Sequence, residues 1–152
     1  MLLTRPLLPI LRKSAKSGPV LVNFIGSQAA VACPPRLSIY AGCKAFLEKL
    51  SRSLDIDEQV WGGSTGVHFQ YHSVGPVISH SYCGPNVPLA SPSSETFAKS
   101  VVARMGCQRR TVTPYIIHAA MQWGMDLIGE WAIDRFSAHT LDAVLKEQAK
   151  RV

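Results

Sequence analysis

The stretch V-L-V-N-F-I-G-S at residues 20–27 decides the fold class, because an unbroken apolar run there ends in a glycine and a hydroxyl. Runs of β-branched and aromatic residues of this length are typical of strands buried on both faces of a parallel sheet. Residues 37–57 follow it and are expected to form a long helix. A buried strand followed by such a helix indicates an α/β fold. The expected apolar stripe of the helix comprises Cys43, Phe46, Leu47, Leu50 and Leu54.

A candidate proton-transfer site lies where this strand and this helix meet. The pattern Y-A-G-C-K places Tyr40 and Lys44 four positions apart, on one face of the expected helix, and Ser27 precedes Tyr40 by thirteen positions. A cation beside a phenol favours the phenolate, which makes the phenol a better proton donor near neutral pH. We interpret Tyr40 as a general acid for a carbonyl oxygen and Ser27 as a hydrogen-bond donor to it. The hydride has to come from a cofactor, because no side chain supplies one.

An isolated Y-x-x-x-K pattern is more often an ordinary helix pair, with a solvated lysine and a half-buried tyrosine. The surrounding sequence favours chemistry here. The stretch V-H-F-Q-Y-H at residues 67–72 alternates in polarity and is expected to be a second strand. With Ser27, Tyr40 and Lys44 at their spacing, the pattern resembles the catalytic site of the short-chain dehydrogenase/reductase family.

The stretch S-V-G-P-V-I-S-H at residues 73–80 extends this resemblance, because it is similar to the family's P-G-x-V-x-T segment. It departs from that segment in having Val74 for the proline and a serine for the threonine. The resemblance implies that this backbone meets the nicotinamide of NADP(H), with NAD(H) as the alternative. The cofactor-binding residues that it implies are Tyr40, Lys44, Gly75, Val77 and Ser79.

Two further stretches narrow the resemblance. Residues 115–133 (Y-I-I-H-A-A-M-Q-W-G-M-D-L-I-G-E-W-A-I) and residues 4–11 (T-R-P-L-L-P-I-L) are similar to parts of the very-long-chain 3-oxoacyl-CoA reductases and the related 17-beta-hydroxysteroid dehydrogenases. This implies reduction of a long-chain 3-oxoacyl-CoA or a ketosteroid to the hydroxy compound, in fatty acid elongation or other lipid metabolism. It also implies the cytosol-facing side of the endoplasmic reticulum membrane, with the cytoplasm as the alternative.

The family's glycine-rich pyrophosphate motif, G-x-x-x-G-x-G, does not occur in this sequence. We therefore expect the carboxyl-terminal part of a Rossmann-like, doubly wound parallel sheet, with the amino-terminal half, its asparagine and the membrane anchor absent. The expected domains are a partial reductase domain at residues 1–110 and an amphipathic helical extension at residues 111–152. A half-sheet leaves an unpaired edge, which favours a homo-oligomer or a complex with an intact homologue. The alternative function is a non-catalytic interaction or membrane-associated protein that keeps this half-fold.

Composition limits the chain to one core, because 152 residues with 47% hydrophobic content do not fill two. The net charge of +6 comes from scattered basic residues without an aromatic-interleaved stripe, so we expect no nucleic-acid partner. The four cysteines form no C-x-x-C pair, which favours reduced thiols. His68 and His72 would lie about 13 Å apart along a strand, so we expect no metal site.

Residues 112–136 are expected to form an amphipathic helix, because Asp126 and Glu130 give an otherwise apolar segment a polar edge. Two carboxylates near its middle argue against a membrane-spanning helix. The segment either packs against the protein or lies on a membrane surface with Trp123 and Trp131 at the interface. The other expected elements are a proline-limited helix at 2–14, a glycine-rich turn at 59–66, a proline-rich loop at 81–92 and a capped helix at 93–104.

Overall fold

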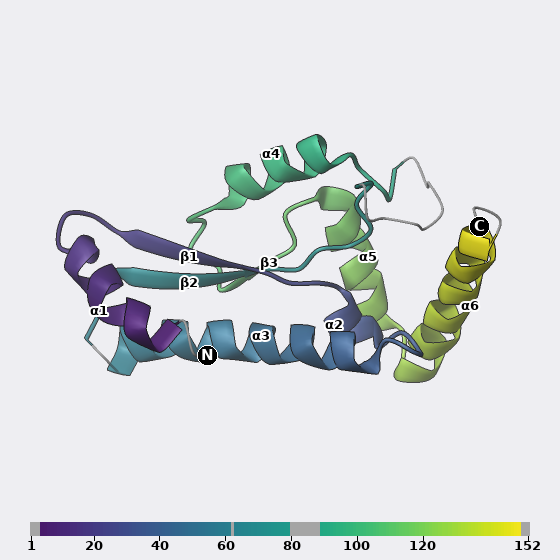
Figure 1. Ribbon diagram of the computed structural model, residues 1–152, viewed down its shortest axis with the longest axis horizontal. Coiled ribbons are helices and arrows are strands. Elements are labelled where there is room, and N and C mark those ends of the chain that lie inside the picture. Colours follow the sequence, from purple (N-terminus) through teal and green to yellow (C-terminus); the bar gives the residue numbers. More distant parts are fainter. Residues whose placement is uncertain (1–3, 62, 80–88, 150–152) are drawn as a thin grey trace.

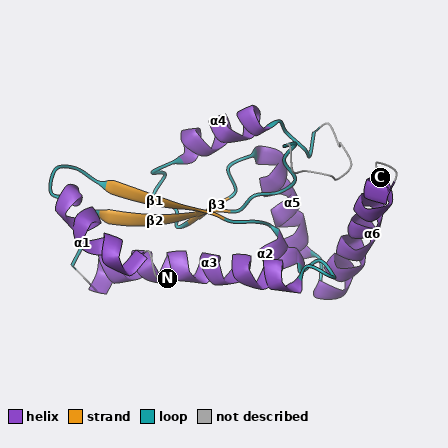
Figure 2. Cartoon of the chain, in the orientation of Figure 1, coloured by secondary structure: helices purple, strands orange, loops and turns teal. Residues whose placement is uncertain are grey.

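The computed structural model describes residues 4–61, 63–79 and 89–149, in which helices surround a small sheet (Figures 1 and 2). The strands are β1 (Val20–Ile25), β2 (Val67–His72) and β3 (Thr111–Val112). The helices are α1 (Thr4–Ala15), α2 (Ala29–Ala32), α3 (Ser38–Ile56), the π-helical turn η1 (Asp57–Trp61), α4 (Ser94–Arg104), α5 (Ile116–Leu127) and α6 (Glu130–Ala149).

The sheet is parallel and has the order β1-β2-β3. The register runs from Val20 opposite Val67 to Ile25 opposite His72, so that β1 and β2 end together. Strand β3 contributes only two pairs to β2. The predicted α/β class with a parallel sheet is confirmed, as are the two strands that the sequence predicted. Within the described parts of the chain, β1 pairs on one side only.

Strand β2 is the centre of the core, with helix α3 along one side of the strands and α4 on the other (Figure 1). Its alternate side chains Val67, Phe69 and Tyr71 are buried. The predicted long helix is confirmed, because α3 runs over nearly the same residues. Its predicted apolar stripe is wrong at Cys43 and Phe46, which are exposed. The buried positions of α3 are Ala41, Ser51 and Asp55.

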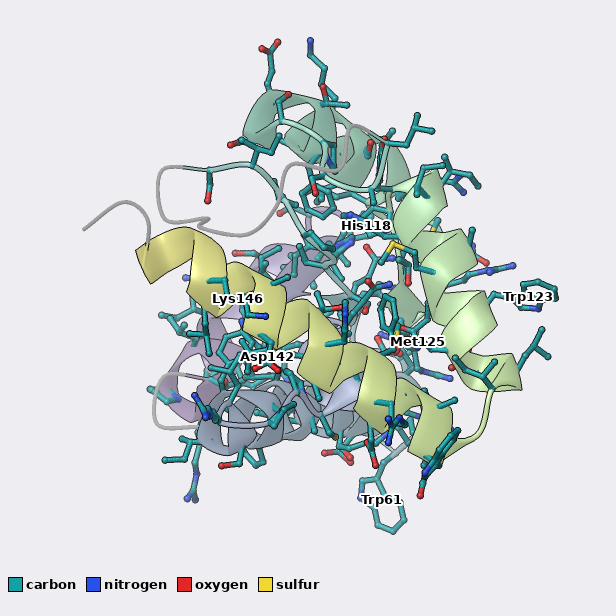
Figure 3. The ribbon with its side chains drawn as sticks, turned by 90° about the vertical axis from the view of Figure 1, so that its right-hand side faces the viewer. Trp61, His118, Trp123, Met125, Asp142 and Lys146 are labelled. Atoms are coloured by element: carbon teal, nitrogen blue, oxygen red, sulfur yellow. The ribbon has the colours of Figure 1, made fainter. Side chains whose placement is uncertain are left out.

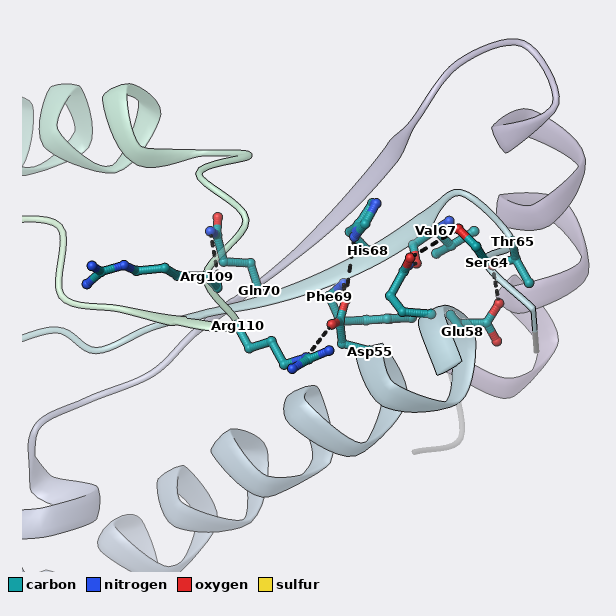
Figure 4. A network of polar contacts seen from close by, with 11 residues as sticks. Asp55, Glu58, Ser64, Thr65, Val67, His68, Phe69, Gln70, Arg109 and Arg110 are labelled. Carbon is teal, nitrogen blue, oxygen red and sulfur yellow. Dashed lines mark hydrogen bonds and ion pairs between the residues drawn. The ribbon is translucent and has the colours of Figure 1, made fainter. Parts of the chain in front are cut away.

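Polar side chains close the amino-terminal end of the sheet (Figure 4). Asp55 accepts hydrogen bonds from the Phe69 backbone N–H at 3.0 Å and from Arg110 Nε at 2.6 Å. Because β3 is too short to reach Phe69, the Asp55 carboxylate takes the place of a neighbouring strand there. Buried Glu58 accepts from Arg12 Nε at 2.9 Å, and this ion pair ties α1 to η1.

The carboxyl-terminal third differs from its prediction. One amphipathic helix over residues 112–136 is wrong: Val112 lies in β3, and α5 and α6 are separate helices because Ile128 is extended (φ −90°, ψ 137°). Trp123 and Trp131 therefore lie on different helices. Since β3 begins at Thr111, the sheet continues past the domain boundary that we expected after residue 110.

The smaller predictions have mixed outcomes. The capped helix is confirmed, because Ser93 Oγ accepts the Thr96 backbone N–H at 3.2 Å at the start of α4. The predicted turn at 59–66 is wrong over its first residues, which η1 occupies. Most of the predicted loop at 81–92 lies outside the described residues. None of the described helices is long and apolar enough to cross a membrane.

Candidate active site

Ser27 lies at the carboxyl-terminal end of the parallel strands, two residues after β1 ends. The Gly26 backbone N–H donates to the His72 carbonyl at 2.8 Å, so the β1–β2 ladder continues up to this serine. Ser27 is half-buried, and its Oγ accepts the Ala29 backbone N–H at 3.1 Å at the start of α2. The Ser27 hydroxyl is therefore held by hydrogen-bonded backbone at the carboxyl ends of the strands, which is where ligands of open α/β sheets bind.

The structure brings Tyr40 and Lys44 together in the first turns of α3. Lys44 Nζ lies 5.6 Å from the centre of the Tyr40 ring and donates to the Ile25 carbonyl at 3.0 Å. The ammonium thus connects the phenol to the end of the serine strand. Tyr40 is 45% exposed, so its ring is accessible to a ligand.

Tyr71, which sequence reasoning did not select, joins these two parts of the site. Its hydroxyl accepts the Ser27 backbone N–H at 3.1 Å and lies 3.3 Å from the Lys44 carbonyl, to which it can donate. Burial raises the pKa of Tyr71, which keeps the phenol neutral. A Cβ at Gly26 would lie 1.9 Å from Tyr71 Cζ, so only glycine fits beside the ring. The glycine directly before Ser27 was the only sequence signal of this close approach.

The segment that follows β2 lies beside Ser27. The Gln28 backbone N–H donates to the Val74 carbonyl at 2.8 Å. Along the segment, Gly75 and Val77 are half-buried and Ser79 is exposed. A Cβ at Gly75 would lie 2.7 Å from both Gln28 Oε1 and an atom of the His118 ring, so this backbone also needs a glycine. The predicted catalytic and cofactor residues thus lie at one end of the sheet.

A cavity of about 220 Å³ adjoins Ser27 and Tyr71. Hydroxyls, an amide and two carboxylates line it, including Ser73, Gln122 and Asp126. Tyr40 and Lys44 do not contribute to its wall. A substrate at Tyr40 would therefore lie outside this cavity, which is also smaller than the pockets that enclose most small ligands.

The residues present fit the nicotinamide end of a cofactor. The Lys44 ammonium has three donors, one of which binds the Ile25 carbonyl, so others remain for ribose hydroxyls. Gly75 is packed against Gln28 and the His118 ring, which fixes the backbone that leads to Val77 and Ser79. Among the described residues, no group of three His, Cys, Asp or Glu side chains is placed to hold a metal ion.

Solved structures share this fold. A structure from a study of 7beta-hydroxysteroid dehydrogenase stereoselectivity matches 85% of this chain and 51% of its own, with a TM-score of 0.66 and 16% identity. A short-chain dehydrogenase from Sphingobium yanoikuyae in complex with NADPH matches 84% of this chain and 53% of its own, with a TM-score of 0.52 and 19% identity. No family model matches the sequence.

Sequence relatives of this chain carry names of the same kind as these structures. Mouse very-long-chain 3-oxoacyl-CoA reductase is 32% identical, and the match covers 97% of this chain and 46% of the mouse protein. The rat protein of the same name is 33% identical over 84% of this chain and 38% of its own length. A Caenorhabditis elegans protein named as a steroid dehydrogenase is 30% identical over 86% of this chain and 41% of its own. The chain therefore spans less than half the length of these relatives.

The parallel half-sheet has the fold of about half of the Rossmann-type proteins that it matches, and Ser27, Tyr40 and Lys44 lie near the carboxyl ends of its strands. With its relatives, this shows that the chain belongs to the short-chain dehydrogenase/reductase family. Within that family it is similar to the very-long-chain 3-oxoacyl-CoA reductases and the steroid dehydrogenases.

Proposed function

We propose that this chain carries the proton-transfer half of an NADP(H)-dependent reductase that converts a long-chain 3-oxoacyl-CoA, or a ketosteroid, to the 3-hydroxy compound. The observation that carries the proposal is the placement of Tyr40 and Lys44 beside the strand end that bears Ser27. The names of the relatives support the substrate class. From the family resemblance, we also propose a place in fatty acid elongation at the endoplasmic reticulum membrane, with the cytoplasm as the alternative.

In this mechanism, the Ser27 hydroxyl donates a hydrogen bond to the substrate carbonyl oxygen and holds it against Tyr40. The Tyr40 hydroxyl gives its proton to that oxygen as negative charge develops on it. The nearby Lys44 ammonium stabilises the phenolate that remains and binds the cofactor ribose. Gly75, Val77 and Ser79 would hold the nicotinamide. A bound reduced cofactor, NADPH or alternatively NADH, would supply the hydride for the carbonyl carbon.

The test is reductase activity of the protein expressed from its complete gene, followed by NADPH oxidation with a long-chain 3-oxoacyl-CoA. Tyr40→Phe should lower kcat by about 100- to 10,000-fold, because it removes the proton donor and leaves the ring in place. Lys44→Ala should impair both turnover and NADPH binding. Lys49→Ala is the matched control on α3, because this lysine is exposed and makes only a weak contact with Glu48. A Tyr40→Phe protein with the wild-type rate would refute the catalytic role.

A non-catalytic interaction protein is the second candidate function. Among the described residues, β1 pairs on one side only, and an open strand edge can bind a strand of another chain. A second copy of this chain or a homologous reductase would be the partner. This role is favoured if the wild-type protein forms a defined complex with either of them and reduces no substrate.

A further inference from the structure

His118 is a fully buried imidazole on α5 that the proposed reaction does not use directly. Figure 3 shows it on the inner side of α5, with Trp123 on the outer side of the same helix. Its Nδ1 lies 3.2 Å from the Gly75 backbone nitrogen, whose N–H points at it. Its Nε2 lies 3.1 Å from the Pro76 carbonyl and 3.0 Å from the Ala90 carbonyl. The imidazole therefore binds backbone groups at residues 75 and 76 through its two nitrogens, and at residue 90 through Nε2.

These partners define which nitrogen of His118 carries the proton. A backbone N–H only donates, so Nδ1 has to accept the bond from Gly75. Carbonyls only accept, so Nε2 has to carry the hydrogen that Pro76 and Ala90 share. The neutral ring with its proton on Nε2 satisfies all three partners, whereas an imidazolium would direct a second N–H at the Gly75 N–H. Burial, which lowers the pKa of His118, favours the same neutral form.

We refer to the contacts of the His118 ring with Gly75, Pro76 and Ala90 as the His118 clamp. The backbone of His118 connects this clamp to the segment that bears Ser27. The Gln28 side-chain amide donates to the His118 carbonyl at 2.6 Å, and Gln28 directly follows Ser27. The centres of the Phe97 and Tyr115 rings lie 5.7 and 4.9 Å from the centre of the imidazole and pack against it. One residue of α5 thus fixes the segment after β2 and the segment after β1.

We propose that His118 is a positioning residue, which holds Gly75 and so aligns residues 75–79 with Ser27 for the nicotinamide. The inference rests on the proposed reductase function. It adds a role for His118, which lies in the segment 111–152 that we expected from the sequence to be a separate helical extension. The close approach of the Gly75 backbone to the ring carries it, because a clamp at that distance leaves the following peptide groups little freedom. Helix α5 is therefore part of the cofactor end of the site.

The first experiment is nitrogen-15 NMR of the wild-type protein near neutral pH, with amide exchange at Gly75. We expect a neutral His118 with its proton on Nε2 and a slowly exchanging Gly75 amide. In His118→Phe, which keeps the ring contacts but has no acceptor, exchange at Gly75 should accelerate about tenfold or more. An Nδ1-protonated or charged ring in the wild type would overturn the proposal, and this measurement does not depend on whether His118→Phe folds.

The second experiment separates positioning from stability through the affinity for NADPH. In folded His118→Phe, the Kd and KM for NADPH should rise about tenfold while the KM for the acyl substrate stays within twofold. His118→Asn should recover part of the loss, because its side-chain oxygen can accept the Gly75 N–H in place of Nδ1. The matched control is His139→Asn, since His139 is exposed on α6. Unchanged NADPH affinity in folded His118→Phe would overturn the proposal.

A wild-type protein that binds no NADPH and turns over no substrate would instead refute the proposed function. The exchange rates of the Gly75 amide would then test only whether His118 holds Gly75.

Discussion

The two ends of the parallel strands are held by different kinds of contact. At the amino-terminal end, carboxylates bind guanidinium groups, as in the Arg12–Glu58 pair (Figure 4 shows the neighbouring contacts). At the carboxyl-terminal end, neutral Tyr71 accepts the Ser27 backbone N–H and neutral His118 accepts that of Gly75, and both rings lie against a glycine, Gly26 or Gly75, that leaves no room for a Cβ. Long charged side chains can move and still pair, whereas rings against glycine backbone fit in one arrangement. This rigid end, where the Lys44 ammonium also lies, is the one that bears the candidate active site.

The largest expected effect is at this rigid end. Gly26→Ala should lower the free energy of unfolding by about 3 kcal/mol, because its Cβ would lie 1.9 Å from the Tyr71 ring, which is buried and cannot move aside. Chemical denaturation followed by circular dichroism measures the change. The loss should be accompanied by a lower reductase rate, because Tyr71 has to shift away from Ser27.

The control for this substitution is Gly42→Ala in α3. A Cβ at Gly42 meets nothing within 4 Å, and alanine favours helix over glycine by up to about 1 kcal/mol. Gly42→Ala should therefore leave stability unchanged or raise it slightly. If the Gly26→Ala and Gly42→Ala proteins are equally stable, the packing around Tyr71 can rearrange to accept a Cβ. The carboxyl-terminal end would then not be more rigid than the amino-terminal end.

The sequence predicted the elements that rest on local patterns. The strand at 20–25, the strand at 67–72 and the long helix between them follow from runs and periods of apolar residues, which are short-range signals. The capped helix was predicted for the same reason, since Ser93 and its helix are adjacent in the chain. Of the site, Ser27, Tyr40 and Lys44 were selected because the family's spacing is also local, and their catalytic roles stay predictions.

What the sequence did not predict depends on residues far apart in the chain. Tyr71 and His118 read as ordinary members of a strand and an apolar helix, and only the fold brings them to the glycines before Ser27 and after Val74. The stripe of α3 was misjudged because its buried face ends in Asp55, whose partners come from β2 and from Arg110. The only local sign of the break between α5 and α6 is Gly129. Since a single glycine does not interrupt the apolar pattern of the segment, the sequence predicted one continuous helix.

The second expected effect is that the two ends of the strands lose their contributions to the free energy of unfolding at different pH values. Burial holds the pKa of His72 and of His118 below the ordinary 6.5, so below that pH the unfolded chain binds protons that the folded chain does not. Stability should therefore begin to fall as the pH drops below 6.5, by up to about 1.4 kcal/mol per pH unit for each histidine. The Arg12 guanidinium holds the pKa of Glu58 below its ordinary 4.5, so the contribution of this pair is intact above 4.5 and is lost only at lower pH.

Denaturation curves over a series of pH values test this order. In His118→Asn the decline between pH 6.5 and 4.5 should become shallower, whereas Arg12→Ala should alter mainly the region below 4.5. His139→Asn, which replaces an exposed imidazole, should keep the wild-type profile. A wild-type stability that stays constant from pH 6.5 to 4.5 would contradict the assignment of neutral, buried histidines to the carboxyl end.

The smallest expected effect on the fold concerns the outer side of the helices beyond the rigid end. Whereas His118 fixes the inner side of α5, Trp123 on the same helix is 67% exposed and Trp131 on α6 is 74% exposed. Exposed tryptophans are typical of surfaces that lie at a membrane interface, where the indole ring is partly buried among lipid headgroups. We expect the protein to bind anionic lipid vesicles weakly, because Asp126 and Glu130 oppose the attraction of its net positive charge.

Vesicle flotation with mixtures of phosphatidylserine and phosphatidylcholine measures this binding. Replacing both tryptophans, Trp123→Ser with Trp131→Ser, should reduce it by about tenfold, since each indole loses apolar area that the lipid would bury. Because neither ring is packed in the described core, the free energy of unfolding should change by less than about 0.5 kcal/mol. Salt should weaken the binding of the wild type, since its electrostatic part is screened within about 10 Å at 0.1 M. A doubly substituted protein that floats as well as the wild type would exclude these rings as a membrane contact, and one that unfolds would place them in a core formed with residues beyond those described. Only a loss of stability would extend the rigid end of the molecule into α5 and α6, whereas selective loss of vesicle binding would confine it to the inner side of α5.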